Sequence, residues 1–176
     1  MLEGPTHTEQ QAAAGQKPGD GEFSPFETIP GDESRGLLLV CDHARNALPP
    51  GYDTLGLHEA QLARHIGYDI GVESVTRMLA QKLNAPAILT GYSRLLIDPN
   101  RGRDDPTLIM RLSDGAVVPG NAYIDEKERE HRKSAYYDPY HDAVSQTLDR
   151  MNARSKTPVL LSIHSFTPNW RGNDRP

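Results

Sequence analysis

The sequence is poor in cysteine and has no long apolar run. Its 176 residues include one cysteine, Cys41, so no internal disulfide can form. No apolar run is long enough to cross a bilayer, and the N-terminus lacks the apolar stretch of a secretory signal. These absences exclude a disulfide-stapled fold, and we expect a protein of the reducing cytoplasm with no membrane partner. Cys41 lies in an apolar run, where we expect it to pack as an inert thiol.

Blocks of positive charge are also missing. The chain carries 19 Lys and Arg against 24 Asp and Glu, for a net charge of −5. This balance argues against nucleic acid or an anionic membrane surface as the main partner. We find no glycine-rich phosphate loop and no Gly-x-Ser-x-Gly elbow for a nucleophilic serine. The length and the 36% of hydrophobic residues suffice for one domain with a sizeable core.

The first 25 residues differ in composition from the rest. They are rich in Gly, Gln, Thr, Ala and Pro and poor in large apolar side chains, so they cannot bury enough surface to offset their ordering entropy. We predict a flexible tail over residues 1–25 and a single domain over residues 26–176.

Short apolar runs in that domain alternate with amphipathic stretches. Continuous apolar runs bounded by turn residues predict strands, and the two that begin at Leu37 and Val159 predict strands buried on both faces. Alternating strands and helices indicate an α/β domain with a mainly parallel or mixed central sheet flanked by helices. The other strands are expected within residues 26–35, as an edge strand and turn, over residues 86–90 and over residues 95–98.

Apolar residues at helical spacing predict a helix over residues 59–83. Asp125 and Glu128 form a capping box for a second helix, which restarts or kinks at Asp138-Pro139. Between the two helices, residues 99–123 are expected to be a long loop. The second helix carries an apolar stripe made of Tyr140, Ala143, Val144, Thr147, Leu148 and Met151.

Two histidines stand where buried strands turn polar. His43 follows the run from Leu37, and His164 follows the run from Val159. In an open α/β sheet, ligands bind beyond the carboxyl ends of the strands, so the two imidazoles are expected in one crevice. Imidazole is a common zinc ligand, and Asn46, three residues after His43, is close enough to share the site. The alternative is that each histidine is a hydrogen-bonded structural residue.

Four further polar residues lie near these strands or on the predicted helices. His65 and Asp69 are one helical turn apart and either meet at the site or form an ordinary surface pair. His141 either faces the site or caps its helix, and Ser165, beside His164, is a candidate to hydrogen-bond a substrate.

Three stretches resemble the signature stretches of the N-formylglutamate amidohydrolase family, in the same order. They are Cys-Asp-His-Ala-Arg-Asn (41–46), Ser-Arg-Leu-Leu-Ile-Asp-Pro-Asn-Arg (93–101) and Ser-Ile-His-Ser-Phe-Thr-Pro (162–168). A His-Ile-x-x-Asp-Ile-Gly stretch, here at 65–71, is also typical of this family. The resemblance implies a zinc-dependent amidohydrolase whose fold is similar to that of the zinc carboxypeptidases and aspartoacylase.

The resemblance also implies a small acidic N-acyl amino acid as substrate. The leading expectation is hydrolysis of N-formyl-L-glutamate to formate and glutamate. The alternatives are another N-acyl amino acid and a non-catalytic domain that binds carboxylates.

By resemblance to the carboxypeptidases, the zinc ligands would be His43, Asn46 and His164. The carboxypeptidase pattern is His-x-x-Glu, whereas this chain has His-x-x-Asn, and an amide oxygen is a weaker, neutral ligand. Asp42 is therefore a reserve candidate, either as a ligand or as an acceptor that fixes a histidine tautomer.

The Asp-Pro-Asn-Arg stretch at 98–101 is similar to the aspartoacylase segment that holds a substrate carboxylate. The resemblance assigns Asn100 and Arg101 to carboxylate binding, because an arginine fork matches a carboxylate bidentately. Arg94 would polarise the scissile carbonyl or hold a second carboxylate. The alternative is that both arginines pair with nearby acids, namely Asp98, Asp104 or Asp105.

Family members continue beyond the Ser-Ile-His-Ser stretch, and this chain stops at Pro176, twelve residues after His164. By resemblance to the carboxypeptidases, a glutamate acting as general base is expected in such a continuation. That segment would also cover or extend the sheet edge beside the His164 strand. An uncovered edge invites association, so we expect this chain to aggregate or to form a homo-oligomer unless another chain shields that edge. Within the chain, the remaining candidate acids and bases are Asp42, Asp98, Asp104 and His141.

Overall fold

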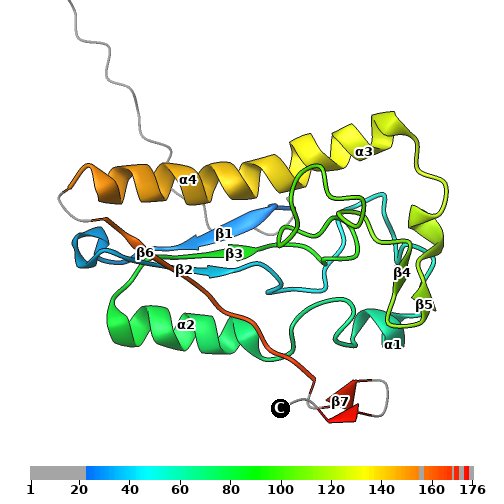
Figure 1. Cartoon of the computed structure of the whole chain (residues 1–176), viewed down its shortest axis with the longest axis horizontal. Coiled ribbons are helices and arrows are strands. Elements are labelled where there is room, and N and C mark those ends of the chain that lie inside the picture. Colours follow the sequence, from blue (N-terminus) through cyan, green and yellow to red (C-terminus); the bar gives the residue numbers. More distant parts are fainter. Residues whose placement is uncertain (1–22, 155–156, 168, 171–172, 175–176) are drawn as a thin grey trace, which may run out of the picture.

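The computed structural model describes residues 23–154, 157–167, 169–170 and 173–174. Its centre is a four-stranded sheet in the order β1-β3-β2-β6 (Figure 1). Strand β2 pairs in parallel with β3 and β6, and β1 pairs antiparallel with β3. This mixed sheet confirms the predicted α/β class. The strands are β1 (Phe26–Ile29), β2 (Leu37–Cys41), β3 (Ala87–Thr90) and β6 (Val159–Ser162).

Helices cover both faces of the sheet (Figure 1): α4 (Asp138–Asn152) lies on one face and α2 (Val72–Leu83) on the other. Successive residues of β2 alternate between the faces, as the period of a strand requires. Leu38 and Val40 pack with the predicted stripe of α4, whereas Leu39 and Cys41 pack with α2. The Cys41 side chain is fully buried, and this burial raises the pKa of its thiol to about 11, as expected of an inert packing residue.

The prediction of one helix over residues 59–83 was wrong. The chain forms a short helix α1 (Glu59–Leu62) and then turns before α2 begins. A Cβ on Gly67 would lie 2.3 Å from the Leu62 carbonyl oxygen, and Gly71 has a left-handed φ of +85°. Both features break a continuous helix, and apolar periodicity does not report them. The break frees the intervening segment to fold back toward the end of β2, where the Asp69 amide donates to the His43 carbonyl over 3.0 Å.

The predicted strand over residues 95–98 does not form either. Leu95, Leu96 and Ile97 are fully buried, as the apolar run suggested, but the backbone turns. The Leu96 amide donates to Ser93 and the Asp98 amide to Leu108, so these groups are satisfied without a sheet partner. The loop predicted over residues 99–123 includes a small hairpin of β4 (Leu112–Ser113) and β5 (Ala116–Val117), and a short 3-10 turn at Pro119–Asn121.

The second predicted helix begins at the expected cap. Asp125 accepts a hydrogen bond from the Glu128 amide over 2.8 Å and starts α3 (Glu126–Arg132). The helix changes at the predicted place: a π-helical segment, Lys133–Tyr137, joins α3 to α4, which begins at Asp138 with Pro139 in its first turn. Proline has no N–H to offer the helical ladder, and a wider turn accommodates that loss.

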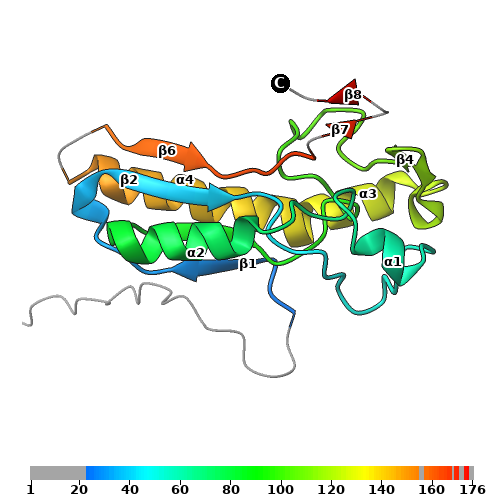
Figure 2. The same ribbon diagram turned by 90° about the horizontal axis from the view of Figure 1, so that it is seen from below.

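Strand β6 is not buried on both faces as predicted. Among the described residues it pairs only with β2, so it forms an edge of the sheet (Figure 2). Val159, Leu160 and Leu161 are 60%, 47% and 42% exposed.

At the opposite edge, the predicted strand and turn within residues 26–35 are confirmed as β1 and a 3-10 turn at Glu33–Arg35. After β6 the chain forms a short hairpin of β7 (Asn169–Trp170) and β8 (Asn173–Asp174).

An ion-pair cluster ties β1 to α2. Glu27 accepts from Arg77 through both carboxylate oxygens, over 2.6 and 2.9 Å, and from Arg45 over 2.5 Å. Glu73 contacts the same two arginines. The hydrogen bonds from Arg77 lower the pKa of Glu27 despite its partial burial.

The helices of the described part of the chain are too short or too polar to span a membrane. Of the predicted tail, only residues 23–25 are described, and Phe23 packs edge-on against Tyr136 with ring centroids 6.0 Å apart. Residues 1–22 lie outside the described part.

Candidate metal centre

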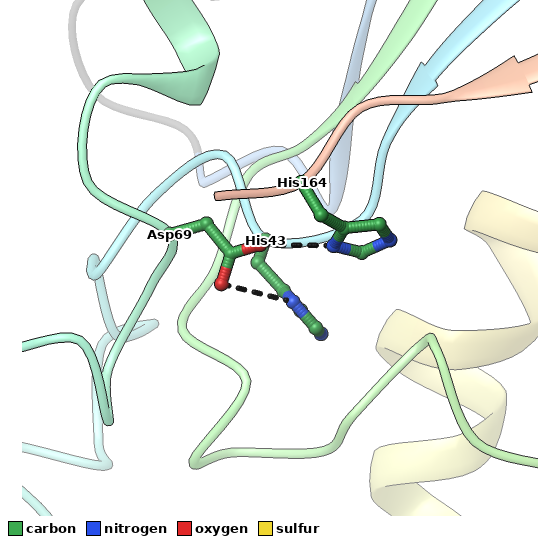
Figure 3. A group of neighbouring side chains, drawn as sticks. All are labelled: His43, Asp69 and His164. Carbon is green, nitrogen blue, oxygen red and sulfur yellow. Dashed lines mark hydrogen bonds and ion pairs between the residues drawn. The ribbon is translucent and has the colours of Figure 1, made fainter. Parts of the chain in front are cut away.

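The two strand-end histidines meet, because β2 and β6 are neighbouring parallel strands. The ring centroids of His43 and His164 are 5.1 Å apart. The Asp69 carboxylate lies between them (Figure 3): one oxygen is 2.9 Å from His164 Nδ1 and the other is 3.4 Å from His43 Nδ1. One potential ligand atom from each of the three residues lies within 4.8 Å of the others, so this group could hold a metal ion.

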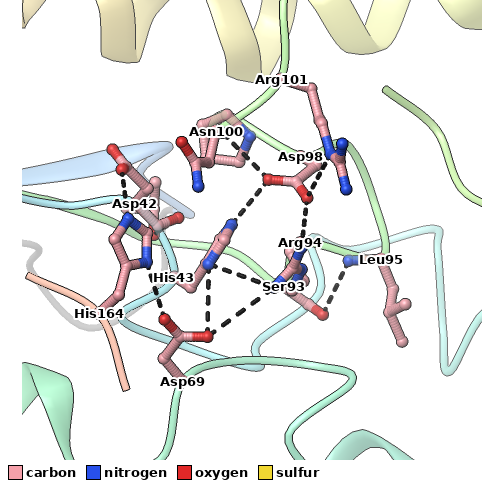
Figure 4. A network of polar contacts seen from close by, with 12 residues as sticks. Asp42, His43, Asp69, Ser93, Arg94, Leu95, Asp98, Asn100, Arg101 and His164 are labelled. Atoms are coloured by element: carbon pink, nitrogen blue, oxygen red, sulfur yellow. Dashed lines mark hydrogen bonds and ion pairs between the residues drawn. The ribbon is translucent and has the colours of Figure 1, made fainter. Parts of the chain in front are cut away.

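The outer nitrogen of each imidazole contacts a second carboxylate (Figure 4). His43 Nε2 is 2.7 Å from Asp98 Oδ1, and His164 Nε2 is 3.2 Å from Asp42 Oδ2. We call Asp42 and Asp98 the outer carboxylates. Both are buried, and Asp42 also accepts from the hydroxyls of Tyr140, over 2.5 Å, and Ser162, over 2.9 Å. Each imidazole is therefore held between two carboxylates in a fixed orientation.

Three carboxylates surround the two histidines and determine the charge of the site. Hydrogen bonds to Asp42 and Asp69 raise the pKa of His164 to about 9. Burial disfavours the charged form of His43, but its bonds to Asp69 and Asp98 outweigh burial and raise its pKa as well. Burial likewise opposes ionisation of Asp69, and the two histidines nevertheless hold the pKa of that carboxyl below its usual range. The cluster therefore stabilises positive charge between the two histidines and Asp69. Either bound protons or a bound cation can supply this charge.

The donor set fits zinc. Two imidazoles and one carboxylate are ligands that zinc takes in catalytic sites, with a further position left for water or substrate. Histidines that bind metals almost always donate their other ring N–H to a carboxylate, carbonyl or water, which fixes the tautomer. The outer carboxylates are in position for this role, and Asp69 occupies the position between the histidines that the sequence analysis gave to Asn46.

Arg94 lies beside two of the candidate ligands, His43 and Asp69. Its Nη2 donates to Asp98 over 2.7 Å, and its Nη1 lies 3.4 Å from His43 Nδ1 and 3.8 Å from Asp69 Oδ1. A tight turn sets this position, since the Arg94 amide donates to Gly67 and the Ser93 hydroxyl bonds the same carbonyl. The guanidinium is thus held with one edge on a buried carboxylate and the other beside the candidate ligands.

A cavity of about 480 Å³ opens over the cluster. Asn100, Arg101 and Ser165 line it, as do His43, Arg94 and the other two candidate ligands. Arg101 is 43% exposed, and the one ion pair its side chain forms with the described residues is a long contact of 3.7 Å with Asp98. Arg94 thus has the strong ion pair with Asp98 that the alternative interpretation expected, whereas Arg101 keeps most of its fork free for a ligand.

The other predicted site residues are engaged elsewhere. The Asn46 amide donates to the Leu62 carbonyl over 3.2 Å. His65 does not meet Asp69, because the predicted helix is broken between them; its Nε2 lies 3.1 Å from Asp114. His141 lies 3.1 Å from the Pro99 carbonyl, beside a smaller cavity of about 240 Å³, and burial lowers its pKa.

Two contacts of the site had little or no signal in the sequence. Asp98 belongs to the stretch 93–101, but its contact with His43 spans 55 positions. Asp114 lies in the turn between β4 and β5, where the sequence predicted only a loop. Both contacts depend on how distant segments pack.

The fold and the site define an α/β protein: a mixed sheet covered by helices on both faces, with two histidines that share one carboxylate beyond the strand ends. More particularly, the chain belongs to the N-formylglutamate amidohydrolase family, whose model matches residues 35–176. This membership confirms the resemblance seen in the sequence.

The solved structures that are similar to this chain include the following two. A gene product from Agrobacterium tumefaciens is 36% identical, with a TM-score of 0.80 over 86% of this chain and 60% of that one. An N-formylglutamate amidohydrolase from Ralstonia eutropha JMP134 is 23% identical, with a TM-score of 0.59 over 81% of this chain and 57% of that one, and supports the fold alone. This chain therefore spans less than two thirds of the length of either structure. No curated protein matches it.

Proposed function

We propose that this chain is a zinc-dependent hydrolase that cleaves the amide bond of N-formyl-L-glutamate to formate and glutamate. One observation carries the proposal: Asp69 lies between the inner nitrogens of two histidines whose outer nitrogens contact buried carboxylates. Such an arrangement brings one potential ligand atom of each residue within 4.8 Å of the others and suits a divalent cation. Membership of the family supports the choice of an amide as substrate.

His43, Asp69 and His164 would hold the zinc ion. Asp69 takes the place of Asn46 in this set because its carboxylate lies between the two histidines, whereas Asn46 donates to the backbone carbonyl of Leu62. When bound, zinc acidifies a water molecule and polarises a carbonyl, which is the help that hydrolysis of a formamide needs. The outer carboxylates would accept hydrogen bonds from the two Nε2–H groups and so leave both Nδ1 atoms available to the ion.

Arg94 would stabilise the carbonyl oxygen as it gains negative charge. Its pairing with Asp98 fixes one edge of the guanidinium, and the donors of the other edge lie within 4 Å of His43 and Asp69. A donor that is already oriented in this way needs no reorganisation during the reaction, which makes it more effective than water.

Arg101 and Asn100 would bind a carboxylate of the substrate. Both line the cavity, and the Arg101 fork has room for two parallel hydrogen bonds to one carboxylate. Ser165 lines the same cavity, although its hydroxyl bonds the Ile70 carbonyl over 3.0 Å. A cavity with two arginines favours an acidic N-acyl amino acid over a neutral one.

The test combines metal content with turnover. The purified chain should hold about one zinc ion, as a single catalytic site would. His164→Ala and Asp69→Ala should lose it, whereas Asn46→Ala, the matched control, should retain it. The zinc-loaded chain should release formate from N-formylglutamate. Equal zinc in all variants would refute the ligand set. Zinc and carboxylate binding without turnover would identify a non-catalytic domain, and preferred turnover of another N-acyl amino acid would change the substrate.

A further inference from the structure

The cavity over the cluster holds few groups that can move a proton. Its titratable side chains include the three candidate ligands, whose ring or carboxylate atoms are occupied by one another and by the outer carboxylates. Arg94 and Arg101 also line it, but a guanidinium stays protonated and cannot act as a base. Among the described residues that line the cavity, His65 and Asp114 are therefore the remaining side chains that can accept or donate a proton.

These two residues contact each other across the cavity rim. His65 comes from the turn after α1, and Asp114 from the turn between β4 and β5, where its φ of +43° is left-handed. His65 Nε2 lies 3.1 Å from Asp114 Oδ2, and Arg64 Nη2 donates to the same oxygen over 3.2 Å. The His65 side chain is 34% exposed and that of Asp114 is 25% exposed, so both are reachable from the cavity.

From this juxtaposition we propose that His65 is the proton carrier of the hydrolysis and that Asp114 is its positioning residue. The inference rests on the proposed function and extends it. A carboxylate that accepts Nε2–H holds the neutral imidazole in the tautomer whose Nδ1 lone pair can take a proton, as in other histidine–carboxylate pairs. The charged groups around His65 are Asp114 and Arg64 at the rim, and Asp69, Arg94 and Arg101 in the cavity wall.

The proton is moved twice. As the oxygen of the attacking water bonds to the formyl carbon, one O–H bond breaks and its proton passes to His65 Nδ1. When the C–N bond then breaks, its electron pair goes to the amine nitrogen, which takes that proton from His65. The products are formic acid and the free amine, which exchange a proton with solvent, and His65 returns to its neutral form. General acid–base help of this kind contributes about 10²–10⁴-fold in rate.

The experiment measures formate release with zinc-loaded protein. His65→Gln should lower kcat by about 10²–10⁴-fold with little change in KM. Asp114→Asn should lower kcat less, because the imidazole remains but loses its orientation. Imidazole added to His65→Gly should restore part of the rate, which a merely structural role of His65 would not allow.

Arg64→Gln is the matched control. It removes a contact to the same carboxylate oxygen without touching the cavity, and kcat should stay within about threefold of wild type, since exposed ion pairs contribute little. Equal losses of kcat in Arg64→Gln and His65→Gln would show that the contacts with Asp114 only hold the β4–β5 hairpin in place. That result would overturn the assignment of His65. A raised KM with unchanged kcat in His65→Gln would make His65 a substrate contact instead.

The activity of the wild-type protein distinguishes a failure of this inference from a failure of the proposed function. If wild type releases formate and His65→Gln keeps its rate, the assignment of His65 is wrong and the hydrolase stands. If zinc-loaded wild type releases no formate at any pH, the proposed function itself is wrong, and the role of His65 is refuted with it.

Discussion

Replacing Asp98 by asparagine should weaken the metal centre while leaving its shape almost unchanged. Asp98 is fully buried and accepts hydrogen bonds from His43 over 2.7 Å, from Arg94 over 2.7 Å and from the Asn100 amide over 3.0 Å. An asparagine oxygen can keep the bond from His43 but offers no negative charge. Loss of such a carboxylate behind a metal-binding histidine costs about 10–100-fold in metal affinity.

The same substitution should lower stability. At least one hydrogen bond between charged groups is lost, and such bonds contribute about 1.5–3 kcal/mol. For a domain of this size, a loss of about 2–3 kcal/mol corresponds to a fall of about 4–12 °C in Tm.

Zinc affinity is measured by competition with a chromophoric chelator, and Tm by circular dichroism of the zinc-free protein. Asp104→Asn is the control, because Asp104 is an exposed acid six positions further along the same segment. The reasoning is refuted if Asp98→Asn binds zinc as tightly as Asp104→Asn does. A lower Tm with unchanged zinc affinity would make Asp98 a structural residue only.

Three further outcomes are expected. Arg94→Ala should lower kcat by about 10²–10³-fold and Arg101→Ala should mainly raise KM, so identical losses would refute their separate roles. The pKa of Glu27 is lowered in the folded state, so its contribution to stability is present above the usual glutamate value of 4.5 and is lost as the pH falls through the folded pKa; urea unfolding of Glu27→Gln should depend less on pH in that acid range, and equal slopes would refute this. Wild type should self-associate through β6, which forms an edge of the sheet among the described residues. Sedimentation should show that Leu160→Lys reduces association, whereas Val117→Lys, at a residue of the β4–β5 hairpin that is even more exposed, does not.

Local pattern determined much of this protein. The apolar runs from Leu37 and Val159 predicted strands, and the polar switch at their ends located His43 and His164, because side-chain polarity and strand period are read from neighbouring residues. The cap at Asp125 and the apolar stripe of α4 were readable for the same reason. Parallel neighbouring strands then brought the two histidines within 5.1 Å, as expected of strand ends in one sheet.

Tertiary structure decided which groups complete the site. Asp69 rather than Asn46 lies between the histidines, because Gly67 and Gly71 break a helix that apolar spacing alone made continuous. The contact of Asp98 with His43 joins positions far apart in the chain, as does that of Asp114 with His65, and no local pattern encodes such contacts. Burial of β6 was misjudged for a related reason: an apolar run reports that a strand belongs to a sheet, whereas its place at the centre or the edge depends on which other segments pair with it.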